Sequence, residues 1–139
     1  MTTDTIDPAS LSDDAFLAAV ETTAISPRDF GHFSHVRAAY LLLNATREFA
    51  PALQRMSVAL KAIAGKAGVP EKYHETITVA FMALVHVRMA GDAHGGDWQA
   101  FARSNPDLLN SNPLAGIYTP EQLASPLARR VFILPTQAA

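Results

Sequence analysis

An uncharged stretch of twelve residues, Thr76 to Val87, constrains the fold more than any other part of the chain. Only two threonines and His86 interrupt its apolar residues. A helix that is apolar on nearly all sides must be surrounded by other elements. The stretch is also far shorter than the roughly 20 apolar residues that a membrane span needs. We therefore predict that residues 69–91 form the central helix of a bundle.

The sequence around this stretch predicts the other helices of the bundle. Ser12, followed by two aspartates, is typical of a helix N-terminus. Ser34 is a candidate N-cap for a second helix that runs to residue 49. Pro51 suits the first turn of a third helix over residues 51–68, which ends in a glycine-containing segment. A short fifth helix is expected over residues 98–103.

The last third of the chain has a different pattern. Polar residues are followed by proline at Asn105-Pro106, Thr119-Pro120 and Ser125-Pro126, which predicts short helical turns joined by loops. The apolar tail at residues 131–135 is expected to pack extended against the bundle. The prediction is an all-α, single-domain bundle of four to five helices over residues 1–139, with an ordered C-terminal segment of short helical turns. Residues 1–10 are expected to be a flexible N-terminus.

Composition argues against several classes of protein. Eleven basic and thirteen acidic residues give a net charge of -2, and no basic run is longer than Arg129-Arg130, so a nucleic-acid partner is not indicated. The absence of cysteine excludes disulfides, thiolate metal sites and cysteine nucleophiles, and it fits a reducing compartment. We expect a cytoplasmic protein, monomeric or homodimeric, with no membrane partner.

Two short stretches, "FGHFSHVRAAY" and "KYHETITVAF", contain the candidate functional residues. The first holds His32 and His35, and the second holds His74 and Glu75. Residues three apart in a helix share one face, so the two histidines of the first stretch can converge. If their helix packs beside the fourth helix, all four side chains can meet. Thr78 stands where an H-E-x-x-H zinc motif needs its second histidine, so that motif is absent.

Imidazoles together with one carboxylate suit copper, iron or zinc better than calcium or magnesium. The leading hypothesis is a small enzyme of unknown reaction that uses this site and a transition metal. The predicted metal ligands are His32, His35, His74 and Glu75. Glu75 and His74 are the candidates for proton transfer during catalysis. Tyr73 and Arg129 are expected to contact a small-molecule substrate.

Two alternative functions are compatible with the same residues. In one, the site holds no metal and acts by acid–base chemistry on a small organic acid held by arginine. In the other, the protein is a non-catalytic binding or accessory protein, with structural histidines and an apolar C-terminal tail that serves as an interface. His86 lies too far along its helix to join the site, and a buried structural role is expected for it. His94 is predicted to lie in a surface loop.

Four motifs in the chain also occur in this order in one protein family. They are F-x-H-x-x-H-V, Y-H-E-T-I-T, N-P-D-L-L and S-P-x-A-R-R-V-F, and they extend from Phe30 to Pro135. With them the chain resembles a family of small, mostly uncharacterised bacterial α-helical proteins. The resemblance carries His32, His35, His74 and Glu75 onto matching positions and implies no particular activity.

Overall fold

The computed structural model describes residues 8–91 and 94–135, and this part of the chain is helical and contains no strand. The all-α prediction is therefore confirmed. The α-helices are α1 (Asp13–Glu21), α2 (His32–Thr46), α3 (Phe49–Lys66), α4 (Glu75–Ala90), α5 (Trp98–Ser104), α6 (Pro106–Asn110), α7 (Pro120–Ala124) and α8 (Pro126–Arg130). Three short 3₁₀ helices join them: η1 (Pro8–Ser10), η2 (Pro27–Asp29) and η3 (Pro70–Lys72).

The predicted four to five helices correspond to α1–α5, and the predicted short helical turns are the five-residue helices α6, α7 and α8. The flexible N-terminus predicted for residues 1–10 lies outside the described residues up to residue 7. Pro8–Ser10 form η1. None of the helices that the structure describes is both long and apolar enough to cross a bilayer.

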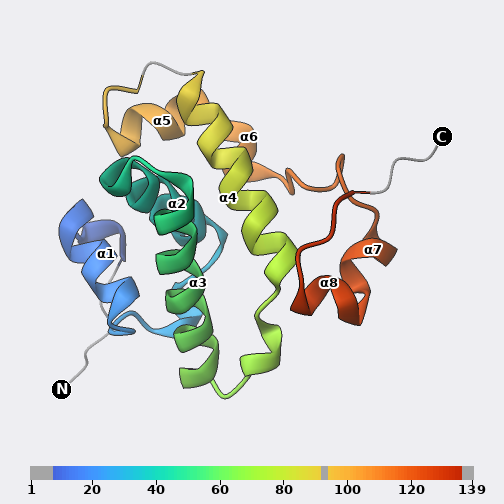
Figure 1. Cartoon of the computed structure of the whole chain (residues 1–139). Coiled ribbons are helices and arrows are strands. Elements are labelled where there is room, and N and C mark those ends of the chain that lie inside the picture. The colour runs from blue at the N-terminus through green and yellow to red at the C-terminus, as the bar shows by residue number, and fades with distance from the viewer. Residues whose placement is uncertain (1–7, 92–93, 136–139) are drawn as a thin grey trace.

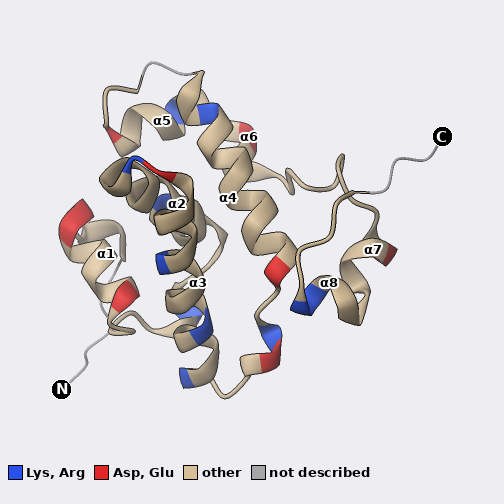
Figure 2. Cartoon of the chain, in the orientation of Figure 1, with Lys and Arg blue, Asp and Glu red and all other residues tan. Residues whose placement is uncertain are grey.

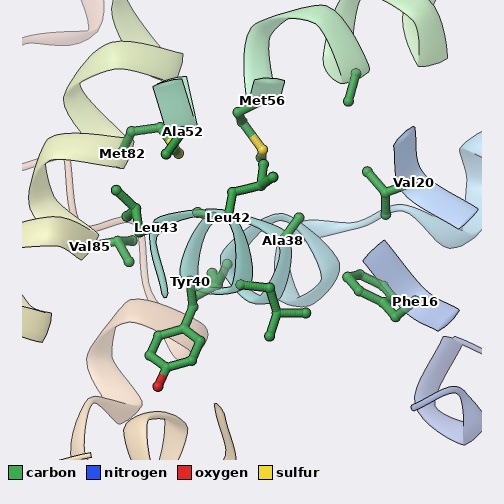
Figure 3. Packing of buried hydrophobic residues seen from close by; sticks show 14 of the residues in the cluster. Phe16, Val20, Ala38, Tyr40, Leu42, Leu43, Ala52, Met56, Met82 and Val85 are labelled. Carbon is green, nitrogen blue, oxygen red and sulfur yellow. The ribbon is translucent and has the colours of Figure 1, made fainter. Parts of the chain in front are cut away.

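The centre of the bundle is α2 rather than α4, which corrects the prediction made from the apolar stretch. Every residue of α2 from Val36 to Leu43 is buried, because α1, α3, α4, α5 and α6 all pack against it. Figure 3 shows side chains of α1, α3 and α4 on different sides of α2. In contrast, α4 exposes Ile77 (39%) and Val87 (67%), so its outer face remains apolar and open to solvent.

The start of α2 also differs from the prediction, and the difference matters for the site. The helix begins at His32 after Gly31, three residues before the predicted start. Ser34 is therefore a buried residue inside the first turn, where its hydroxyl donates a hydrogen bond to the Asp29 carbonyl (3.4 Å). As a result, His32 and His35 both belong to the first turn of one helix and lie on one face.

A buried guanidinium fastens the N-terminal segment to α2. Arg37 donates hydrogen bonds to the carbonyls of Pro8 (3.0 Å) and Leu11 (2.9 Å) and forms an ion pair with Asp13 (2.9 Å). Its guanidinium also lies 4.4 Å from the centre of the Phe16 ring. Arg37 is only 7% exposed, so its guanidinium loses most of its water contacts on folding. The contacts with Pro8, Leu11 and Asp13 replace them.

The C-terminal segment packs on the beginning of α4, as Figure 1 shows. The hydroxyl of Thr76, a fully buried residue, donates to the Val131 carbonyl (2.9 Å) and accepts from the Ile133 N–H (3.1 Å). The Tyr118 hydroxyl donates to the Ile133 carbonyl (2.8 Å). These hydrogen bonds hold the tail extended against the bundle, as the sequence predicted.

Replacing Arg37 tests the contact between the N-terminal segment and α2. Arg37→Met keeps the apolar stem but leaves the two backbone carbonyls without their donor, so we expect a loss of about 2–3 kcal/mol in the free energy of unfolding. Urea denaturation measures it. Arg103→Met, at an exposed position, is the matched control and should change stability by less than about 0.5 kcal/mol. Equal stabilities for the two variants would contradict this account.

Candidate functional site

His74 is a structural tie between α4 and α7. Its Nδ1 accepts the Ile77 backbone N–H (3.1 Å) and so caps the start of α4. Because Nδ1 is an acceptor, the ring proton lies on Nε2, which donates to the Leu123 carbonyl (2.7 Å). His74 is 7% exposed, and both of its ring nitrogens are used within the protein. These contacts occupy the lone pair that a metal ion or a substrate proton would need.

Substitutions at His74 should separate its two contacts. His74→Ala removes both, whereas His74→Asn keeps a side chain able to cap the helix but too short to reach Leu123. We expect losses of about 2–3 kcal/mol for alanine and about half of that for asparagine, measured by urea denaturation. Limited proteolysis between residues 119 and 130 should become faster in both variants, because α7 loses its tie. Unchanged proteolysis rates would show that His74 does not hold α7.

Glu75 takes part in a chain of hydrogen bonds with Tyr73 and Ser57. The Tyr73 hydroxyl donates to Glu75 Oε1 (2.7 Å) and, having used its hydrogen there, accepts from the Ser57 hydroxyl (3.0 Å). Burial raises the pKa of Tyr73, and the hydrogen bond to Glu75 adds to that rise. The phenol therefore stays protonated at neutral pH and joins α3 to the start of α4.

Arg129 also contacts the start of α4, but through the backbone. Its Nη1 donates to the carbonyls of Glu71 (3.0 Å) and Lys72 (3.5 Å), the last residues of η3. The guanidinium thus supports the segment that leads into α4. Its predicted contact with a substrate stays a prediction.

The metal site predicted from the sequence is not assembled in the described part of the chain. Within it, no three residues among histidine, aspartate and glutamate are placed to hold one ion. His74 uses both ring nitrogens elsewhere, and Glu75 accepts from Tyr73. Copper, iron or zinc at these residues therefore stays a prediction.

The two sequence stretches nevertheless meet, at a cavity of about 500 Å³ that we call the outer chamber. It lies between η2, α3 and the start of α4, and both His35 and His74 line it, with Tyr73 beside them. Most of its remaining wall is apolar and comes from Phe30, Leu60, Ile63, Ala64, Val69 and Ile77. Two exposed cations, Arg28 and Lys72, complete the lining. Figure 2 shows basic residues on the second half of α3 and on η3, two of the elements that line this chamber.

His35 is the polar group of the outer chamber that stands out. It is packed against the Phe30 ring, with 4.7 Å between the ring centres. Neither of its ring nitrogens has a hydrogen-bond partner within residues 8–91 and 94–135. Burial, and to a lesser extent the neighbouring His32, together lower the pKa of His35 from its usual value to about 4. The ring is therefore neutral at pH 7.

His35 also lines a second, smaller cavity of about 130 Å³, which we call the inner chamber. His32 lines it together with His35. The Nε2 of His32 lies 2.6 Å from the Leu108 carbonyl and donates to it, and the ring meets the Phe81 ring edge-on at 5.7 Å. His32 therefore ties α2 to α6 beside the chamber.

Comparison of the chain with protein-family models, with curated proteins and with solved structures finds no match. The resemblance in the four motifs therefore stays a prediction, and the function has to be argued from the geometry of the two chambers.

Sequence reasoning missed the α3 wall of the outer chamber and its two cations, because the pattern of α3 indicates only an amphipathic helix. His94 lies in the loop before α5, as predicted, but it is half-buried there. In the structure, His94 Nδ1 accepts hydrogen bonds from the Tyr40 hydroxyl (2.5 Å) and the Gly96 N–H (3.1 Å), and its ring packs on Phe101. His86 stacks on Phe49, with ring centres 5.6 Å apart and the planes at 22°. Both histidines belong to the packing of the bundle.

The lowered pKa of His35 predicts a specific loss of stability in acid. The unfolded chain binds a proton at this residue below about pH 6.5, but the folded protein does so only near its pKa of about 4. Keeping His35 neutral therefore does not cost the folded protein stability above pH 6.5. As the pH falls toward 4, the free energy of unfolding decreases, by about 2 kcal/mol at pH 4.5. His35→Gln should therefore lose less stability between pH 7 and 4.5 than the parent. The control His86→Gln should keep the full loss, and identical pH profiles for all three proteins would contradict the prediction.

Proposed function

We propose that the protein binds a small organic acid in the outer chamber. The observation that carries this proposal is the neutral His35 imidazole, which lacks a hydrogen-bond partner among the described residues and lines a largely apolar cavity with two cations. Ligand sites commonly combine apolar walls with a few polar groups that orient the ligand. At about 500 Å³, the outer chamber also has the size of a typical small-molecule site.

Each part of the chamber accounts for one part of the ligand. Arg28 and Lys72 are exposed, and they offer positive charge to a carboxylate at the solvent side. The walls from α3 and α4 bury an apolar body. A neutral imidazole has one N–H and one free lone pair, so His35 can form a hydrogen bond with a hydroxyl, carbonyl or amide group of the ligand.

The same geometry favours binding over acid–base catalysis by His35. A general base works best when its pKa is near the pH at which the protein operates. With its pKa at about 4, the His35 ring accepts a proton much less readily than an ordinary histidine. The other predicted acid–base groups, His74 and Glu75, are held by hydrogen bonds within the protein.

A transition metal is a separate hypothesis with a direct test. Binding at the predicted residues would require His74 to release the Ile77 N–H or the Leu123 carbonyl. We therefore expect substoichiometric metal when tag-free protein is measured by mass spectrometry. Near-stoichiometric metal that is lost in both His35→Ala and His74→Ala would contradict this expectation and establish a metal site.

Binding of small organic acids can be tested with a panel that varies in size and polarity. We expect at least one acid to raise the melting temperature and to bind by calorimetry. His35→Leu should weaken that binding about tenfold through the lost hydrogen bond. Lys72→Gln should weaken it severalfold and make the remaining affinity less dependent on salt. A panel without any binder, or equal binding by the parent and His35→Leu, would overturn the proposal.

Two control variants keep this experiment specific. Arg103→Gln removes an exposed cation that does not line the chamber, and His86→Gln removes a histidine that stacks on Phe49 instead. Both should bind the acid with the parent's affinity. A similar loss in these controls would show that the effect reflects net charge or general stability.

A further inference from the structure

The two chambers have a common boundary. His35 of α2, Leu60 of α3, and Ile77 and Thr78 of α4 line both of them. The imidazole of His35 therefore lies where the outer chamber meets the inner one.

The inner chamber offers apolar contacts rather than polar partners. Its walls include Met56 and Met82, which pack from α3 and α4, and Phe81 and Leu114. Apart from His35, each polar residue that lines it makes a hydrogen bond within the protein. The Thr78 hydroxyl donates to the His74 carbonyl (2.8 Å), His32 donates to Leu108, and Asn112 Oδ1 accepts the Leu114 N–H (3.2 Å). A polar ligand group would give up hydrogen bonds to water there and gain few in return, whereas an alkyl group has no such hydrogen bonds to lose.

From these observations we propose that the ligand is an elongated amphipathic carboxylic acid with an unbranched apolar tail. Its carboxylate lies at Arg28 and Lys72, its body fills the outer chamber and places a hydroxyl, carbonyl or amide group at His35, and its apolar tail extends past His35 into the inner chamber. This inference rests on the proposed function, because it assigns the outer chamber to the acid group. It adds a second subsite and with it the class of ligand.

The size of the inner chamber limits the length of the tail. Its volume of about 130 Å³ is close to that of an apolar protein cavity of about 150 Å³ that holds one benzene molecule. The chamber therefore accepts about four to six carbon atoms.

The boundary is built from side chains that can adjust. Leu60 is half-buried and Ile77 is 39% exposed, so neither is locked on all sides by packing. Within the inner chamber, the two methionines have flexible, unbranched side chains that adapt to an irregular occupant. A tail can therefore pass His35 without disrupting the central helix α2.

The affinity of straight-chain acids should rise with chain length until the inner chamber is full. Each methylene that enters the inner chamber should tighten binding about three- to fourfold, as expected for the burial of one CH₂ group. Once the chamber is full, further methylenes should give no gain. The experiment is isothermal titration of the full chain with straight-chain alkanoic acids of increasing length, kept below the concentrations at which they form micelles.

Two variants should change, in opposite directions, the chain length at which affinity stops rising. Leu114→Phe reduces the inner chamber, so the affinity should stop rising at a shorter chain while the shortest acids bind as before. Phe81→Leu enlarges it, so the rise should continue for one or two more carbons. Ile117→Phe is the control, because Ile117 lies in the same segment between α6 and α7 as Leu114, is 39% exposed and lines neither chamber. It should keep the parent's profile.

The outcomes separate this inference from the proposed function. If acids of the mixed panel bind in a His35-dependent way but the affinity of alkanoic acids does not grow with chain length, the inner chamber is not a subsite and the proposed function stands. The inference is also overturned if affinity stops rising at the same chain length in Leu114→Phe, in Phe81→Leu and in the parent, while both variants still melt cooperatively. If no acid of any length binds, both proposals fail. A shorter limiting chain length in Leu114→Phe and a longer one in Phe81→Leu would support the inference, since misfolding cannot increase the chain length up to which affinity rises.

Discussion

The enclosure of α2 is the constraint on which the rest of the structure depends. A helix buried over eight successive residues, Val36 to Leu43, can form only when neighbours cover every side of it. The other elements therefore arrange themselves around α2, and the buried Arg37 ties the N-terminal segment to it. The first turn of α2 escapes this enclosure. There the helix presents His35 to both chambers and His32 to the inner one, so the most extensively buried of the described helices positions the polar group of the proposed site.

The two histidine-containing stretches share a cavity but have different tasks. His74 uses its two ring nitrogens to begin α4 and to hold α7, whereas the His35 ring nitrogens have no partner in the described ranges. Burial makes protonation of His35 costly, and the neighbouring His32 adds to that cost, which keeps its pKa near 4. The protein thus maintains one neutral imidazole on an apolar wall. Such a group suits recognition of a ligand more than proton transfer at neutral pH.

Several parts of this arrangement could be predicted from local sequence. The caps at Ser12 and Ser125, and the prolines that begin the short C-terminal helices, mark element boundaries that the structure shares. The meeting of residues 30–40 with 72–81 could also be anticipated, because apolar faces on both helices demand burial. The four-residue metal set could not be tested by pattern alone. Spacing along a helix does not reveal that a backbone N–H and a distant carbonyl already occupy the His74 ring.

The helical character of the chain, the start of most helices and the few polar residues that stand out are all encoded locally. These properties follow from local propensity and from hydrophobic periodicity, which act over a few residues. Tertiary packing was needed to place α2 rather than α4 at the centre, to give His74 its contacts with α4 and α7, and to bring His35 into the lining of both chambers. Those outcomes depend on contacts between residues far apart in the chain, such as His74 with Leu123 and His32 with Leu108. No local pattern specifies such pairs, because they arise from how whole helices pack.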